Sequence, residues 1–101
     1  MIDTIPEAIR RKQTPVFSGV VAYFPDALLD LARCSFVGNE QHSPGQPLQW
    51  VRDKSNDHLD AAQRHLIDSL KEEYDTDGVR HVTKAGWRIL AALQLLIEAG
   101  Q

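Results

Sequence analysis

Hydrophobic residues recur at helical spacing in three stretches of the chain, and they predict three main helices over residues 25–37, 57–74 and 79–99. Pro25 suits the first turn of the first helix, because proline lacks the N–H that would stay unpaired there. Hydrophobic stripes on the other two helices are expected to face the core. On the second helix the stripe is Leu59, Ala62, Leu66 and Leu70, and on the third it is Val82, Ala85, Ile89, Leu93, Leu96 and Ile97. The pattern predicts an all-α fold.

The segments between these helices lack a hydrophobic period. Residues 38–56 include Pro44, Gly45 and Pro47, and we expect them to form a long irregular loop, since loops of this length in a compact domain often carry function. Residues 75–78, with the sequence Asp-Thr-Asp-Gly, predict a turn that caps the third helix.

The N-terminal part of the chain is less regular. Residues 1–14 are polar with little periodicity, so we expect a flexible arm there, with a turn of helix around Pro6 to Arg11, and a single helical domain over residues 15–101. Within that domain, the stretch from Val16 to Phe24 mixes β-branched and aromatic residues and predicts a short extended segment. The first and third helices carry more apolar surface than one small core can cover, which predicts a homo-oligomer, a dimer being the simplest.

The charge and hydropathy of the chain exclude some classes of partner. The formal net charge is -3, whereas binding to a nucleic-acid polymer draws on an excess of Lys and Arg. No hydrophobic run approaches the roughly 20 residues of a membrane span. The single cysteine, Cys34, has no partner for an internal disulfide. We therefore expect a cytoplasmic protein that binds neither a membrane nor a nucleic-acid polymer.

Basic side chains in the loop and on the last two helices are candidates for binding phosphate. They are Lys54, Arg64, His65, His81, Lys84 and Arg88, and His42 in the loop is a further ligand-binding candidate. Trp50 and Trp87 offer flat faces on which a nucleobase can stack. These residues predict a nucleotide pocket where the loop folds over the cationic side of the third helix. The alternative is a solvated cationic face, with both tryptophans packed in a core or a subunit interface.

The histidines do not have the spacing of a metal site. His58 and His65 lie two helical turns apart, about 10.5 Å at 1.5 Å per residue, so they cannot bind one ion unless a loop ligand lies between them. We expect the histidines at the edge of the core or bonded to a loop.

Three strings of the sequence resemble one known family. They are GNEQHSPGQPLQW at 38–50, KSNDHLDAAQRHL at 54–66 and DTDGVRHVTKAGWRILAALQ at 75–94. Together with the preceding YFPDALLDLA, their order and spacing resemble a phage and prophage family described as dATP/dGTP diphosphohydrolase N-terminal-like domains. The resemblance covers residues 15–98. It implies a phage-encoded, all-α nucleotide-handling domain, loosely similar to MazG-like pyrophosphohydrolases.

The metal-binding motifs of MazG-like enzymes are incomplete in this chain. Those enzymes hold Mg²⁺ with an E-E-x-x-E helix followed by an E-x-x-D helix, because the reaction needs several carboxylates around the metal. Here Glu72 and Glu73 lack a third glutamate at that spacing, and Glu98 is the only carboxylate of the third predicted helix. The remaining candidate Mg²⁺ ligands are Glu40, Glu72, Asp75 and Asp77.

Three hypotheses about function follow from these observations. The first is a domain that binds a nucleotide and hydrolyses dATP or dGTP with a metal ion, as the resemblance implies. The second, which the missing carboxylate motifs favour, is a non-enzymatic protein that sequesters a nucleotide or a cyclic nucleotide signal, as in phage counter-defence. The third is a purely structural oligomerisation module.

Overall fold

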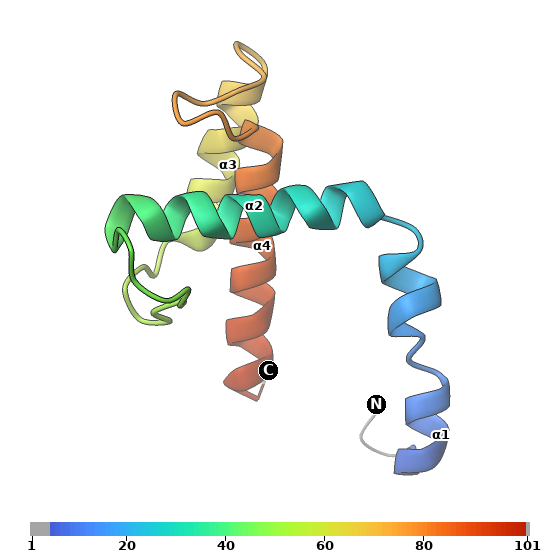
Figure 1. The fold of residues 1–101 in the computed structure, drawn as a ribbon. Helices are drawn as coiled ribbons and strands as arrows, with labels where there is room; N and C mark the ends of the chain where they lie inside the picture. Colours follow the sequence, from blue (N-terminus) through green and yellow to red (C-terminus); the bar gives the residue numbers. More distant parts are fainter. Residues whose placement is uncertain (1–4, 101) are drawn as a thin grey trace.

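The computed structural model describes residues 5–100, and all the regular elements among them are helical (Figure 1). In chain order they are α1 (Glu7–Lys12), the π-helix η2 (Phe17–Val21), α2 (Pro25–His42), α3 (His58–Ser69) and α4 (His81–Glu98). The prediction of an all-α fold with three main helices is confirmed, since α2, α3 and α4 are the long elements. The short helix α1 lies inside the segment predicted as an arm.

The short extended segment predicted between Val16 and Phe24 is wrong. The chain coils there as η2, in which the Ala22 N–H donates to the Phe17 carbonyl at 2.7 Å, the i to i+5 spacing of a π-helix. Backbone polar groups need hydrogen-bond partners. Since the described residues contain no strand that could pair with an extended segment, helical hydrogen bonds satisfy these groups locally.

α2 is longer than the sequence predicts. The helix continues through Gly38 and Asn39, where the prediction ended it, and stops at His42. The chain leaves the helical path at Ser43 and turns at Gly45, whose φ of 74° lies in the left-handed region that favours glycine. The long loop therefore runs over residues 43–57 instead of 38–56.

α3 and α4 form an antiparallel hairpin, joined by residues 70–80 (Figure 1). α3 ends at Ser69, before the predicted residue 74, and α4 begins at His81, after the predicted residue 79. Both helices are shorter than predicted because backbone groups of the linking segment form hydrogen bonds with one another. Tyr74 and Arg80 form an isolated antiparallel bridge, and the chain reverses at Gly78, whose φ is 81°. The turn predicted over residues 75–78 is confirmed. The prediction that it caps the last helix is wrong, because the N-cap residue is Arg80, without a side-chain cap hydrogen bond.

The core is small and consists mainly of short side chains. The buried residues are Ala61, Ala62, Val79, Ala85 and Ala91, together with His58 and His81. The predicted stripes are largely wrong, since Leu59, Leu66, Leu70, Val82, Ile89, Leu93, Leu96 and Ile97 are exposed. The alanines and histidines face the helix contacts instead, and short side chains let two helices approach closely.

α2 crosses the hairpin over α4 (Figure 1). Gly86 of α4 lies at this crossing, since a Cβ added there would meet Cδ2 of Leu31 at 3.7 Å, an ordinary van der Waals contact. Next to this crossing, the Trp87 indole N–H donates to the Ser35 hydroxyl at 2.8 Å. These contacts fix the middle of α2 beside the hairpin.

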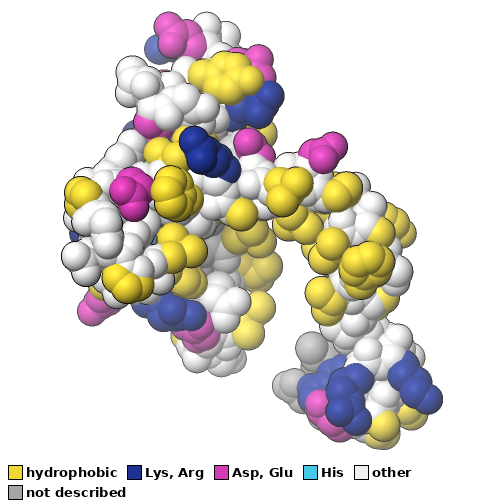
Figure 2. Space-filling model, in the orientation of Figure 1, with side chains coloured by type: hydrophobic (Ala, Val, Ile, Leu, Met, Phe, Trp, Pro, Cys, Tyr) yellow, Lys and Arg dark blue, Asp and Glu magenta, His cyan; other side chains and the backbone are white. Residues whose placement is uncertain are grey.

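The N-terminal elements project from the unit formed by α2, α3 and α4 (Figure 1). Hydrophobic side chains gather over η2 and the start of α2 (Figure 2), and among them Phe17 is 73% and Tyr23 70% exposed. Within the described residues, no single helix has both the length and the apolar character to cross a membrane. One pair of segments reaches this length and apolar character together, but it is bent by 85°; the pair is Glu7–Val21 and Pro25–His42.

Candidate functional site

A cavity of about 510 Å³ lies where the loop 43–57 meets α2, α3 and α4, and we call it the central cavity. Its volume falls within the range of about 300–1,000 Å³ that is usual for small-molecule sites. The cationic side chains that line it are Lys54 from the loop and Lys84 and Arg88 from α4. The aromatic and imidazole side chains that line it are Trp50, Trp87, His42, His58 and His65. The loop and the cationic side of α4 are thus walls of the same cavity.

The loop is fastened to the end of α4. The Arg52 guanidinium donates to both oxygens of the Glu98 carboxylate, from Nε at 2.9 and 3.1 Å and from Nη2 at 3.0 Å. The same guanidinium lies 4.5 Å from the centre of the Trp50 ring. Trp50 in turn packs edge-on against Trp87, with 5.7 Å between the ring centres. These contacts hold two indoles from different elements side by side at the cavity.

His58 lies at the start of α3, with its ring 6.5 Å from Trp50 and 6.3 Å from Trp87. Arg88 donates from Nη1 to Nδ1 of His58 at 3.1 Å. Because a guanidinium only donates, Nδ1 must accept, and the proton of the neutral ring sits on Nε2. Nε2 is buried and has no hydrogen-bond partner among residues 5–100. Burial, followed by the charge of Arg88, lowers the pKa of His58, so the ring is neutral and presents one unpaired N–H.

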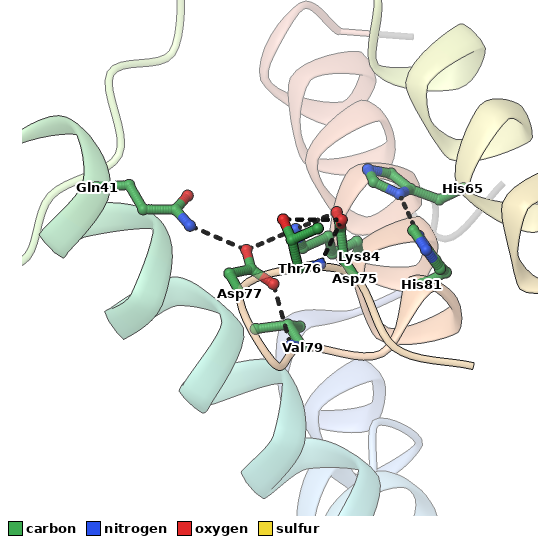
Figure 3. Close-up of polar contacts among 8 residues, drawn as sticks. All are labelled: Gln41, His65, Asp75, Thr76, Asp77, Val79, His81 and Lys84. Carbon is green, nitrogen blue, oxygen red and sulfur yellow. Dashed lines mark hydrogen bonds and ion pairs between the residues drawn. The ribbon is translucent and has the colours of Figure 1, made fainter. Parts of the chain in front are cut away.

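Charged side chains cluster at the turn before α4 (Figure 3), and we call Lys84, Asp75 and Asp77 the Lys84 group. The Lys84 ammonium donates to Asp75 at 2.7 Å and to Asp77 at 2.6 Å. Asp77 also accepts from the Gln41 side chain of α2 at 3.0 Å and from the Val79 N–H at 3.0 Å. Gln41 thereby ties α2 to the turn of the hairpin.

All three charges of this group are stabilised. The hydrogen bond from Lys84 is the main reason that the pKa of Asp75 falls to about 2. Burial opposes ionisation of Asp77, yet hydrogen bonds from Lys84 and the Val79 N–H lower its pKa. Burial likewise opposes the charge of Lys84, but its bonds to both carboxylates raise its pKa. Lys84 therefore already has two anionic partners within the protein.

His65 of α3 and His81 of α4 face each other next to this group (Figure 3). Their Nδ1 atoms are 3.1 Å apart, so one ring donates an N–H and the other accepts. Burial is the main cause that lowers the pKa of His65, and the charges of Lys84 and His81 add to it.

Most of the predicted ligand-binding residues lie together. Of the eight, Lys54, His65, Lys84, Arg88, Trp50 and His42 line the central cavity. Arg64 does not, because it is exposed and pairs with Asp57 at 2.9 Å. His81 is buried against His65 instead of lining the cavity.

The predicted metal carboxylates are not brought together as a set. Glu40 and Glu72 are exposed, on α2 and in the 70–80 turn respectively, while Asp75 and Asp77 bind Lys84. Within residues 5–100, the group of three side chains close enough to share a metal ion is His65, Asp68 and His81. Neither this group nor the unpaired N–H of His58 was predicted from the sequence. Neither is signalled by spacing along the chain, since both depend on how α3 and α4 pair.

The fold and the central cavity define the class of this protein as an all-α domain with a tryptophan-lined pocket that also carries cationic side chains. Comparison with protein families gives the particular family. The model described as dATP/dGTP diphosphohydrolase, N-terminal, matches residues 7–101, so the chain belongs to this family. No curated protein matches the chain, and no solved structure matches it.

Proposed function

We propose that the central cavity binds a purine deoxynucleoside triphosphate, with dATP and dGTP as the first candidates because the family description names them. The observation that carries the proposal is the meeting of cations and indoles in one cavity. Lys54 and Arg88 supply positive charge from two different elements, and Trp50 and Trp87 supply faces for a base. Lys54 has no ion pair among the described residues, which leaves its charge for a ligand.

The unpaired N–H of His58 supports the same proposal. A buried donor without a partner costs about 1–3 kcal/mol, so a ligand oxygen that accepts from Nε2 would recover that energy. Arg88 and His58 then act together, because Arg88 holds the His58 tautomer that presents the donor. Both would contact the anionic part of the ligand.

The reaction that the family description supports is hydrolysis to a nucleoside monophosphate and pyrophosphate. The arrangement of Asp75 and Asp77 does not fit a Mg²⁺ ion, however, because the Lys84 ammonium lies at 2.7 and 2.6 Å from their oxygens. This observation favours a second function, in which the domain holds the nucleotide without cleaving it. Incubation of the pure protein with dATP or dGTP and Mg²⁺ separates the two functions. Release of pyrophosphate supports hydrolysis, and an unchanged nucleotide that co-elutes with the protein supports sequestration.

Arg64 and Arg88 provide a matched pair for testing the binding site. Both contact Asp57, but only Arg88 lines the central cavity. We expect Arg88→Ala to weaken dATP binding roughly tenfold to a hundredfold, since a hydrogen bond to a charged group contributes about 1.5–3 kcal/mol. Arg64→Ala should leave the affinity within about twofold. Isothermal titration calorimetry measures both, and circular dichroism shows that each variant is folded.

Two results would contradict the proposal. One is that the wild-type protein binds neither dATP nor dGTP. The other is that Arg64→Ala and Arg88→Ala weaken binding equally, which would place the ligand outside the cavity.

A further inference from the structure

Three potential metal ligands meet between the two helices of the hairpin. They are His65 and Asp68 from α3 and His81 from the start of α4, and one ligand atom of each lies within 4.8 Å of the others. The Nδ1 atoms of the two histidines are 3.1 Å apart (Figure 3). Two nitrogen ligands of one tetrahedral Zn²⁺, each at about 2.0–2.1 Å from the metal, lie about 3.3 Å apart. We propose that His65, Asp68 and His81 form a binding site for a transition-metal ion of the Zn²⁺ class.

The ligand types determine which metals the site should prefer. Imidazole nitrogens suit Zn²⁺ and its late first-row neighbours, whereas Mg²⁺ prefers an all-oxygen environment. Two histidines and one carboxylate give three protein ligands, the number that leaves a coordination position open for water or substrate. The site therefore differs in both residues and metal from the carboxylate set expected for Mg²⁺.

The charged groups around His65 act in both directions. The Lys84 ammonium and His81 disfavour a positive charge there, whereas the carboxylates of Asp75 and Asp68 favour one. A metal ligand must also offer a free lone pair, and burial lowers the pKa of His65, which keeps this ring neutral. When the metal binds, the Nδ1–H of the donating ring moves to Nε2, so both Nδ1 atoms can coordinate.

The backbone positions the two histidines before any metal binds. The His81 N–H donates to the Glu73 carbonyl at 3.0 Å, which fixes the start of α4 against the linking segment 70–80. His65 and Asp68 lie one turn apart on the same helix, so they point to the same side. A site held by two packed helices requires little rearrangement.

This inference does not depend on the nucleotide site, because the metal is bound by protein atoms alone. The test is titration of the wild-type protein with Zn²⁺ in the absence of nucleotide, followed by calorimetry, and with Co²⁺, followed by its visible absorption. We expect one ion per chain, an absorption spectrum typical of tetrahedral Co²⁺, and no comparable binding of Mg²⁺. The affinity should fall as the pH is lowered, because protonation of the imidazoles competes with the metal.

Variants identify the ligands. His65→Gln and Asp68→Asn should each weaken Zn²⁺ binding at least tenfold, since even changes to residues behind a ligand cost about 10–100-fold. His42→Gln is the matched control, because His42 is an exposed histidine outside the group. This variant should bind Zn²⁺ with the affinity of the wild type. Circular dichroism without metal checks the folding of each variant. If His65→Gln does not fold, Asp68→Asn still tests whether this group binds the metal. The proposal is overturned if the wild type binds no Zn²⁺ at equimolar stoichiometry, or if His42→Gln loses as much affinity as Asp68→Asn.

Discussion

Lys84 shows how the surroundings of one residue change what it can do. Its place on the cationic side of the last helix predicts a phosphate ligand. In the fold its ammonium lies between Asp75 and Asp77 and joins the start of α4 to the preceding turn. Its charge is then used within the protein, and Lys54 and Arg88 are better placed to bind an anion.

The Lys84 group predicts how stability depends on pH. The pKa of Asp75 is about 2 in the folded protein and about 3.9 in an unfolded chain. A lowered carboxyl pKa gives stability that is present above the unfolded value and is lost as the pH falls through the folded one. We therefore expect the urea midpoint of the wild type to decrease as the pH is lowered from about 4 to about 2. In Lys84→Met the urea midpoint should depend less on pH over this range.

Lys84→Met should also cost about 1.5–3 kcal/mol at pH 7, because it leaves two carboxylates without their shared donor. The control is Lys71→Met, which removes an exposed lysine in the same linking segment. An unfolding free energy equally reduced in both variants would show that the loss of any lysine, and not of this contact, is responsible.

At the scale of elements, the hairpin of α3 and α4 depends on the reversal of the chain over residues 70–80. The reversal places His81 against His65 and carries Asp75 and Asp77 to Lys84. Its tightest point is Gly78, with φ of 81°. Both candidate sites take side chains from α3 and α4, so a change in the geometry of this turn affects both sites.

Two glycines test the contribution of backbone conformation. Gly78→Ala should destabilise the fold by about 1–2 kcal/mol, because L-residues with a side chain disfavour positive φ. Gly38→Ala should stabilise it by about 0.5–1 kcal/mol, because Gly38 is helical and an added Cβ meets nothing within 4 Å. Urea denaturation measures both. Opposite signs are expected, and a loss of stability in Gly38→Ala would contradict the assignment of α2 through this position.

At the scale of the whole molecule, the chain is more extended than a compact domain of its size. Its radius of gyration is 15.9 Å, against about 13 Å for a compact chain of 100 residues. The buried core is limited to a few alanines, one valine and two histidines, while long apolar side chains of α2 and α4 stay exposed. Exposed apolar surface of this kind favours association between copies.

We expect the protein to self-associate at micromolar concentration through the apolar side of α4. Leu93 and Ile97 lie one turn apart there, 50% and 60% exposed. The double variant Leu93→Glu with Ile97→Glu should lower the mass measured by size-exclusion chromatography with light scattering. Gln63→Glu adds a charge at an exposed polar position of α3 and should not change the mass. A wild-type protein that is only monomeric would rule out this prediction.

The sequence by itself determined the local features of this protein. Hydrophobic periodicity identifies the three long helices, and the Asp-Thr-Asp-Gly string identifies the turn before α4, because both depend on residues close together in the chain. The three strings that resemble the family are also local, and the family match over residues 7–101 agrees with them.

The tertiary structure alone decided which faces of the helices are buried and which polar groups meet. Periodicity shows that a helix has an apolar side, but the partner helix selects the packed side, and here α3 and α4 pack through alanines and histidines while the leucines stay outside. The pairing of His65 with His81 and the two carboxylates on Lys84 join residues 7 to 16 positions apart. Such contacts depend on which faces of the two helices pack together, and no local pattern specifies that.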